Sequence, residues 1–167
     1  MSKPVIRPAA ATDISAITAI YAHAVRYGTA TFEIDPPDET EMADRFRALA
    51  DGGFPYLVAE LDGLVRGYAY AALYRTRIAY RHTLEDSIYL DPEFQRRGIG
   101  RALLDRLLAD AAGRGFRQMV AVIGDSGQVA SIALHGAAGF RMVGTLEAVG
   151  YKFGRWIDTV LMQRSIG

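Results

Sequence analysis

Apolar residues recur at the three-to-four-residue spacing of a helix face in four stretches of the chain. Residues 13–27, about 38–51, 99–112 and 129–138 are therefore expected to form helices. Thr12 or Asp13 can cap the first of them, and the two prolines before Asp38 suit the start of the second. The many acidic residues of the stretch 33–51 are interpreted as the solvated face of that second helix.

Short runs rich in β-branched and aromatic residues predict seven strands. They lie at residues 5–7, 56–61, 64–74, 87–90, 119–123, 141–151 and 156–164. Asp62-Gly63 is a strong hairpin signal. The almost wholly apolar run 119–123 is expected to be buried on both faces, and residues 75–84 are expected to be irregular. This order of elements indicates an α+β fold with helices on one mixed, mostly antiparallel sheet.

The length of 167 residues suits a single domain over residues 1–167. Hydrophobic residues make up 50% of the chain and charged residues 23%, which excludes a disordered or fibrous protein. The chain has no cysteine, which excludes a disulfide framework, a thiol nucleophile and a cysteine-ligated metal. Because nothing requires an oxidising compartment, a cytoplasmic location is expected.

The charges of the chain are balanced, with 19 lysines and arginines against 19 aspartates and glutamates. Duplex nucleic acid is therefore not an expected partner, because such binding depends largely on clustered positive charge. No apolar run approaches the roughly 18 residues of a membrane span. The first residues also lack a hydrophobic stretch, so neither membrane insertion nor a signal peptide is expected.

A loop with two glycines and three arginines joins the strand at 87–90 to the helix at 99–112. Its sequence is Gln95-Arg96-Arg97-Gly98-Ile99-Gly100-Arg101. The first N–H groups of a helix have no partner within it and lie at the positive end of its dipole, so they can bind a phosphate. A P-loop is excluded because no lysine follows Gly100, and the dinucleotide fingerprint is excluded because Leu103 stands at its third glycine position. A glycine-tolerant loop with surface arginines is the alternative.

Residues 95–100 fit the Gln/Arg-x-x-Gly-x-Gly/Ala signature of the Gcn5-related N-acetyltransferases, the GNAT superfamily. Within it, the chain resembles the phosphinothricin and methionine sulfoximine N-acetyltransferases. The segments that carry this closer resemblance lie at 31–33, 74–83, 85–92, 120–124, 131–135 and 150–158. The resemblance implies a GNAT fold, with a seven-stranded sheet, about four helices, and a splay between the fourth and fifth strands.

The same resemblance implies acetyl-coenzyme A (acetyl-CoA) as the acetyl donor, and no metal. It places the pyrophosphate on the N–H groups of the glycine loop and the pantetheine arm beside the strand at 87–90. The implied cofactor-binding residues are Ile88, Tyr89, Leu90, Gln95, Arg96, Arg97, Gly98, Ile99, Gly100, Arg101, Gln128 and Ser131. Gln128 stands where relatives often carry an asparagine, three residues before Ser131, so its contact with pantetheine is left open.

Acetyl transfer to an amine requires a neutral nitrogen, a stabilised oxyanion and a thiolate that leaves. An α-amino group titrates at about 7.7–8.0, so a weak base suffices. The resemblance implies Glu85 as that base, acting directly or through one water; a salt-bridged acid is the alternative. Asp86 is not expected to share this role, because adjacent strand residues point to opposite faces. The main-chain N–H of Leu90 is the expected oxyanion donor.

His135 stands where many relatives carry a tyrosine, in the context Leu134-His135-Gly136-Ala137-Ala138-Gly139-Phe140. As a cation it can protonate the leaving thiolate, which makes it the second predicted catalytic residue. The alternative is a histidine that only lines the cleft.

The acceptor pocket is expected to be cationic, because a free amino acid brings a carboxylate. Arg75, Arg77, Arg81 and His82 lie within eight residues with no acid between them, and arginine binds carboxylates bidentately. By resemblance, the substrate-binding residues are Phe32, Glu33, Arg75, Arg77 and Tyr80, with Glu33 meeting the substrate ammonium. A solvated loop is the alternative for the arginines.

The expected reaction is thus acetylation of the α-amino group of a small amino-acid analogue. Acetylation of a protein N-terminus or a polyamine, and a CoA-binding sensor without turnover, are the competing hypotheses. Relatives imply a homodimer, in which Lys152, Phe153 and Trp156 close the pocket from the same or a neighbouring subunit. Trp156 taken alone is expected to be a core residue.

Overall fold

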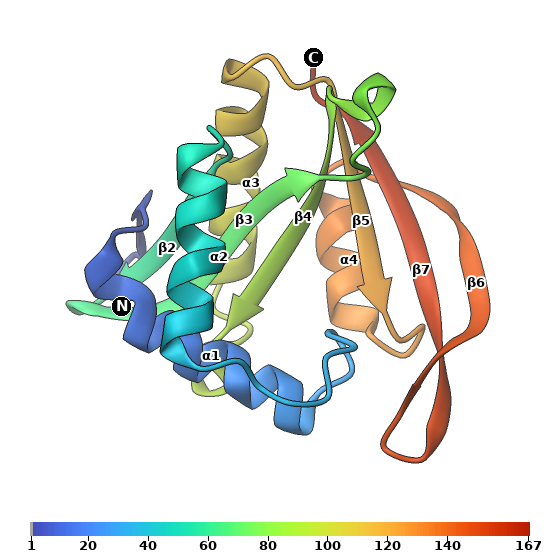
Figure 1. The fold of residues 1–167 in the computed structure, drawn as a ribbon, viewed down its shortest axis with the longest axis horizontal. Helices are drawn as coiled ribbons and strands as arrows, with labels where there is room; N and C mark the ends of the chain where they lie inside the picture. The colour runs from blue at the N-terminus through green and yellow to red at the C-terminus, as the bar shows by residue number, and fades with distance from the viewer. Residues whose placement is uncertain (1) are drawn as a thin grey trace.

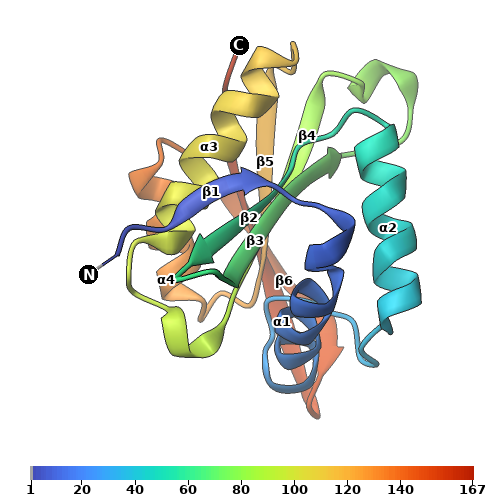
Figure 2. The same ribbon diagram turned by 90° about the vertical axis from the view of Figure 1, so that its left-hand side faces the viewer.

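The computed structural model describes residues 2–167, which form one twisted sheet with helices on both faces (Figures 1 and 2). The strands are β1 (Val5–Pro8), β2 (Tyr56–Leu61), β3 (Leu64–Leu73), β4 (Thr83–Leu90), β5 (Gln118–Gly124), β6 (Arg141–Lys152) and β7 (Arg155–Ser165). The α-helices are α1 (Ile14–Tyr27), α2 (Glu39–Asp51), α3 (Ile99–Gly113) and α4 (Val129–Ala137). Short 3-10 turns, η1 (Ala11–Asp13), η2 (Ile78–Tyr80) and η3 (Pro92–Phe94), precede α1, β4 and α3.

The strand order over residues 2–167 is β1-β2-β3-β4-β5-β7-β6, in a seven-stranded sheet. Every neighbouring pair is antiparallel except β4 and β5, which run parallel. The parallel pairing extends only from Thr83 opposite Gln118 to Glu85 opposite Val120. Beyond this point the two strands diverge (Figure 1). The predicted α+β class and the splay between the fourth and fifth strands are therefore confirmed.

Alternation along the strands divides the core into two clusters. Leu57 and Ala59 of β2 belong to the cluster that contains the apolar face of α3, whereas Tyr56 and Val58 belong to the one built on α1. Helices α1 and α2 thus cover one face of the sheet, and α3 and α4 cover the other (Figure 2). Because both faces are covered, β2 is buried at nearly every position.

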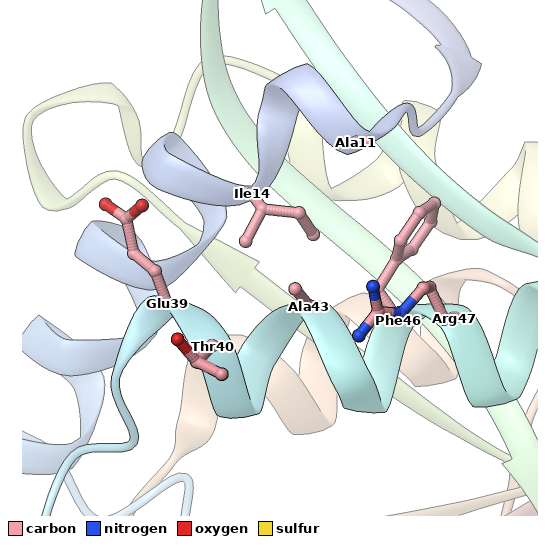
Figure 3. Close-up of a pocket in the computed structure, with 7 residues that line it drawn as sticks. All are labelled: Ala11, Ile14, Glu39, Thr40, Ala43, Phe46 and Arg47. Atoms are coloured by element: carbon pink, nitrogen blue, oxygen red, sulfur yellow. The ribbon is translucent and has the colours of Figure 1, made fainter.

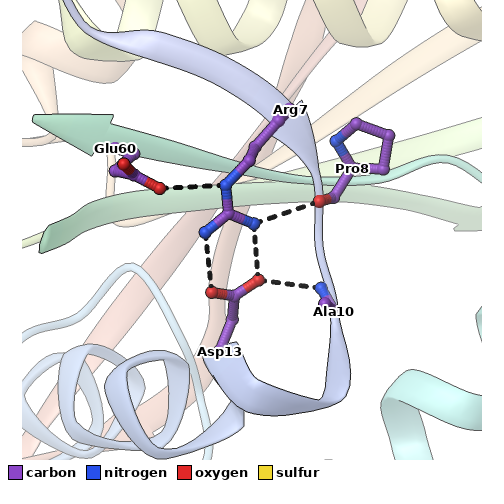
Figure 4. A network of polar contacts seen from close by, with 5 residues as sticks. All are labelled: Arg7, Pro8, Ala10, Asp13 and Glu60. Atoms are coloured by element: carbon purple, nitrogen blue, oxygen red, sulfur yellow. Dashed lines mark hydrogen bonds and ion pairs between the residues drawn. The ribbon is translucent and has the colours of Figure 1, made fainter. Parts of the chain in front are cut away.

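A polar network joins β1 to the start of α1 (Figure 4). The Arg7 guanidinium donates to the two carboxylate oxygens of Asp13 at 2.8 and 2.9 Å, and to Glu60 at 3.0 Å. Asp13 precedes α1 as predicted, but its carboxylate accepts from Arg7 and from the Ala10 N–H instead of capping the helix. The hydrogen bond from Arg7 outweighs burial and holds the pKa of Asp13 below its ordinary value.

The structure corrects the predicted extent of β4. The strand begins at Thr83, four residues before the predicted start, so the end of the stretch expected to be irregular is extended backbone paired with β3. Leu84 and Asp86 are both buried and face the same side. The charged residue at an inward position concealed the period-two pattern of this strand.

Two burial predictions were also wrong. In β5, Met119, Ala121 and Ile123 are buried, but Val122 is 37% exposed, because one face of this strand borders the divergence from β4. Trp156 is 67% exposed on the β6–β7 hairpin instead of lying in the core. Among the described residues, no helix has the length and apolar character needed to cross a membrane.

Candidate active site

The divergence of β4 and β5 opens a small cleft of ≈ 60 Å³. Its walls are Ala30, Asp86, Ser87, Ile88, Tyr89, Val122, Ile123, Gly124, Gln128, Ser131 and His135. On its other side, β4 pairs with β3 along its whole length, whereas its pairing with β5 stops at Glu85. The backbone groups of residues 86–90 that face β5 therefore have no strand partner. They can pair with an extended ligand laid in the cleft, as a further strand would.

A larger groove of ≈ 430 Å³ lies between η1–α1 and α2 (Figure 3). Its lining residues are Ala11, Ile14, Glu39, Thr40, Ala43, Phe46 and Arg47. Figure 3 shows Ile14 and Ala43 facing one another across it, with the Phe46 ring alongside. None of the predicted site residues borders this groove, so the smaller cleft is the candidate active site.

The glycine loop reverses direction in left-handed backbone conformations before α3 starts. Gly98 has φ 79° and ψ 0°, and Arg96 has φ 60°. The first helical hydrogen bond of α3 runs from the Ala102 N–H to the Gly98 carbonyl, so the helix itself supplies no partner for the N–H groups of residues 99–101. This open helix start adjoins β4 through η3 and forms the cradle that a pyrophosphate requires.

The two glycines of the loop lie in different structural surroundings. A Cβ on Gly98 would meet no protein atom within 4 Å, so its requirement is the positive φ. Gly100 is buried, and a Cβ there would lie 3.4 Å from Leu134 Cδ2 and 3.5 Å from Leu90 Cδ1. The space that a Cβ on Gly100 would occupy thus lies in the interface where α3 packs against β4 and α4.

The arginines of the loop are not equally available to an anion. Arg101 donates to both carboxylate oxygens of Asp105 at 2.8 and 2.9 Å, and to the Ala137 carbonyl at 3.0 Å. The Arg97 guanidinium lies 4.7 Å from the centre of the Phe94 ring. Arg96 and Gln95 are exposed. Much of the charge of Arg101 is therefore balanced by its own helix.

Glu85 lies on β4 at the last residue paired with β5, and its side chain is half-buried. Burial raises the pKa of Glu85, the negative charge of Asp86 adds to the increase, and the positive charge of Arg75 opposes it. Glu85 is not one of the residues that line the cleft, but it lies where β4 and β5 begin to diverge. A carboxylate with a raised pKa at this point is suited to accept a proton from an ammonium group.

Tyrosines cover the sheet face that carries Glu85. Tyr68, Tyr70 and Tyr89 form a stacked and tilted cluster with α1 above it. The charges of Glu85 and Glu33 both act on the buried hydroxyl of Tyr70, whose pKa is raised chiefly by burial. The sequence signal for this surface is the tyrosine at alternate positions of β3, but strand propensity alone accounts for the same pattern.

Phe32 and Glu33 lie at the Tyr89 end of this tyrosine surface. Glu33 accepts from Arg45 at 2.8 Å through Oε1, while its buried Oε2 has no hydrogen-bond partner. The Phe32 ring packs so closely on Gly150 and Gly124 that neither position has room for a Cβ. Lys152 is buried beside them and donates to the Thr31 carbonyl at 2.9 Å, and burial lowers its pKa.

The arginine loop lies at the other end of β4. Leu73 pairs with Leu84, so residues 74–82 connect the strands at the Thr83 end. Arg75 stacks 4.2 Å from the Tyr74 ring centre, and its charge reaches Glu85. Arg77 and Tyr80 are exposed in this loop. Within one chain, the structure thus groups Arg75 with Glu85 but separates the arginine loop from Phe32 and Glu33.

Asp86 and His135 meet on the opposite face of β4. Asp86 is 7% exposed and His135 4% exposed, and His135 Nε2 lies 2.9 Å from Asp86 Oδ2. The Nδ1 atom of His135 lies 2.8 Å from the Ser131 carbonyl oxygen. Asp86, which was set aside in the sequence because it does not share a face with Glu85, is therefore a cleft residue in its own right. Sequence reasoning missed it because its partner is 49 residues away.

Gln128 and Ser131, two of the predicted cofactor-binding residues, both border the cleft. The Gln128 amide donates to the Thr29 hydroxyl at 3.3 Å, which is a contact with the α1–α2 connection. Among residues 2–167, no group of three or more histidine, aspartate or glutamate side chains is arranged to hold a metal ion.

The model of the acetyltransferase (GNAT) domain family matches residues 6–161. The chain belongs to the GNAT acetyltransferase family. This acetyltransferase is 58% identical over 154 residues to a phosphinothricin N-acetyltransferase of Alcaligenes faecalis, a match that covers 92% of this chain and 78% of the relative. It is 40% identical over 158 residues to an L-methionine sulfoximine/L-methionine sulfone acetyltransferase of Salmonella typhimurium, with 95% and 92% covered.

The fold of this acetyltransferase matches the crystal structure of a GNAT superfamily phosphinothricin acetyltransferase from Sinorhizobium meliloti in complex with AcCoA. The TM-score is 0.96 at 49% identity, over 99% of this chain and 90% of the other. The resemblance inferred from residues 95–100 and the closer segments is therefore confirmed. The open helix start at Gly98 and the unpaired edge of β4 fit acetyl-CoA, which is the ligand of that relative.

Proposed function

We propose that this acetyltransferase moves the acetyl group of acetyl-CoA to the α-amino group of a small amino-acid analogue of the phosphinothricin or methionine sulfoximine type. The observation that carries the proposal is the placement of Glu85 at the point where β4 leaves β5. A half-buried carboxylate there lies on the face of the tyrosine surface, and the next residue in sequence, Asp86, lines the cleft. The names of the 58% and 40% identical relatives support this class of acceptor.

Acetyl-CoA supplies the thioester, and the residues of this chain divide the remaining tasks between the two faces of β4. On the tyrosine face, Glu85 takes a proton from the acceptor ammonium, directly or through a water. The Leu90 N–H, near the cofactor loop, donates to the oxyanion. On the other face, His135 supplies a proton to the leaving thiolate.

In this proposal the acceptor residues form two parts of opposite charge, which one chain places at opposite ends of β4. Glu33 presents a buried carboxylate oxygen without a partner, which an ammonium group can satisfy. Arg75, Arg77 and Tyr80 supply cations and a hydroxyl for an anionic group, and the charge of Arg75 acts on Glu85. Phe32 forms an apolar wall against Gly150. Arg77→Ala is expected to raise the acceptor KM, and an unchanged value would remove Arg77 from the pocket.

Release of free thiol from acetyl-CoA tests the function directly. Wild type is to be assayed with phosphinothricin, methionine sulfoximine, spermidine and a short peptide, with no acceptor as the blank. We expect thiol release with the two amino-acid analogues and near-blank rates with the others. Release only with the peptide or with spermidine would refute the acceptor class, and release with none of them would favour a CoA sensor.

We also propose that the protein is a cytoplasmic homodimer with the β6–β7 hairpin in its interface. β6 is an open edge of the sheet, which is a natural site for pairing with a second copy. Exposed apolar side chains cover this hairpin: Met142, Val143, Leu146, Val149, Tyr151, Phe153 and Trp156. Light scattering after size exclusion is expected to give twice the chain mass, and Leu146→Arg is expected to give monomers; a monomeric wild type would refute the dimer.

A further inference from the structure

His135 is a buried side chain whose two ring nitrogens both face acceptors. Nδ1 lies 2.8 Å from the Ser131 carbonyl oxygen, which can only accept. Nε2 lies 2.9 Å from Asp86 Oδ2 and 3.2 Å from Oδ1. A neutral imidazole has a single N–H, so it cannot donate to both partners. An imidazolium beside an ionised carboxylate satisfies every one of these contacts.

The burial of this pair makes the charge state consequential. Burial alone lowers the pKa of His135, but the hydrogen bond to Asp86 and the charge of that carboxylate more than offset it, and the net pKa is above the ordinary value. An unpaired charge of either sign in this place is costly, whereas a hydrogen-bonded pair is tolerated. Asp86 and His135 are thus coupled, because without the Asp86 carboxylate the imidazolium form of His135 loses its stabilising partner.

We propose that Asp86 is a positioning residue of the acetyl-transfer site, which holds His135 as a doubly protonated ring at the cleft. The inference rests on the proposed function, and it adds a residue that acts through His135. When His135 gives up its proton, the Nε2–H bond breaks and the S–H bond of the leaving thiol forms. The Nδ1–H stays on the Ser131 carbonyl. The C–N bond of the product forms as the C–S bond of the thioester breaks, and the acceptor ammonium loses two protons in all, which pass through Glu85 to solvent. The Nε2 lone pair of His135 then faces the Asp86 carboxylate, an arrangement that favours the return of one proton from solvent, so each turnover releases one proton.

The other groups around His135 leave Asp86 as the partner that sets its charge. On α4 itself, the ring contacts the Ser131 carbonyl. The uncharged ring of Phe140, which follows α4, lies edge-on with its centre 4.9 Å from that of His135. Arg101 of α3 and Arg164 of β7 donate to the Ala137 and Ala138 carbonyls at the end of α4. Arginine stays cationic throughout the accessible pH range, so these two do not add a titration. From β4, Glu85 projects to the opposite face.

The charge state is measurable without any turnover, because the chain has only three histidines. His23 and His82 are exposed and serve as internal references. We expect ¹⁵N NMR of wild type at pH 7 to show protons on both ring nitrogens of His135, and a single-proton tautomer would overturn the proposal. In Asp86→Asn, the pKa of His135 is expected to fall because the charge of the carboxylate is gone, and an unchanged pKa would likewise overturn it. If Asp86→Asn does not fold, the wild-type spectrum still decides.

Kinetics then separate a positioning role from a purely structural one. In wild type, kcat is expected to fall at high pH as His135 loses its proton, and in Asp86→Asn that limb moves to lower pH together with the NMR pKa. Asp44→Asn, which changes an exposed aspartate of α2, is the matched control and is expected to retain the wild-type profile. A shifted NMR pKa with an unshifted kcat profile would refute the positioning role. Absence of turnover with every acceptor would count against the proposed function. The NMR result tests the charge of His135 separately, because it needs no turnover.

Discussion

Gly98→Ala tests the cofactor loop through its backbone alone. Gly98 has φ 79°, and an added Cβ would meet no protein atom within 4 Å, so the substitution brings no clash. The remaining cost is that of a left-handed conformation for an L-residue, about 1–2 kcal/mol. The loop is exposed and can relax before cofactor binds, so this cost is incurred on binding. We expect the Kd for CoA to rise by roughly 5–30-fold, from about 1.4 kcal/mol per tenfold.

Two other glycines of the chain provide matched controls for titration calorimetry with CoA. Gly63, in the β2–β3 turn, has φ 78° and equally open surroundings, so Gly63→Ala is expected to lower stability by a similar amount without changing the Kd. Gly100→Ala makes contacts of 3.4 and 3.5 Å in a helix, where alanine is favoured over glycine, so its Kd is expected to stay within about twofold of wild type. Wild-type affinity in Gly98→Ala, or equal loss in Gly63→Ala, would refute the reasoning.

Three further predictions concern the base, the β1–α1 network and the core. Glu85→Gln is expected to lower kcat by roughly 10²–10⁴-fold with unchanged CoA affinity. Because burial raises the pKa of Glu85, wild-type kcat should fall as the pH drops through that raised pKa. A pH-independent kcat would contradict the assignment of Glu85 as the base. Asp13→Asn is expected to lower the free energy of unfolding in urea at pH 7 by about 2–3 kcal/mol. Because folding lowers the pKa of Asp13, the stabilisation by its carboxylate is present above the unfolded-state pKa and is lost as the pH falls through the folded-state pKa. A stability difference between wild type and variant that persists in strong acid would contradict the mechanism. Leu107→Ala, at a fully buried position of α3, is expected to cost about 2–5 kcal/mol, and a loss below 1 kcal/mol would show that the site collapses around the cavity.

The parts of the fold that local chemistry determines were predictable from the sequence. The Asp62-Gly63 turn requires positive φ at both residues, at 52° and 78°, and its hairpin is present as predicted. The glycine loop and the start of α3 at Ile99 also depend on neighbours in sequence. Their signals are turn chemistry and helical periodicity, which need no knowledge of the rest of the chain.

The parts that depend on distant partners were not predictable in the same way. Asp86 interrupts the apolar alternation of β4, and only its contact with His135 explains why a charged residue is buried there. Val122 looked like core because every neighbour in its run is apolar, but the divergence of β4 exposes it. Trp156 lies among other exposed apolar side chains on the β6–β7 hairpin, and a hydrophobicity pattern does not distinguish such a surface from the core.

The adjacency of Glu85 and Asp86 gives the site its chemical asymmetry. Successive residues of a strand point to opposite faces, so one peptide bond places a carboxylate on the tyrosine surface and the next on the α4 side. In the proposed assignment Glu85 removes a proton from the acceptor and His135 gives one to the leaving group, and two such groups in one open pocket would exchange protons with each other. Here β4 itself separates them, and the parallel pairing with β5 ends at this same point. The double substitution Glu85→Asp with Asp86→Glu keeps both charges but changes the length of both side chains. We expect it to impair turnover more than the CoA affinity, because neither residue belongs to the glycine loop.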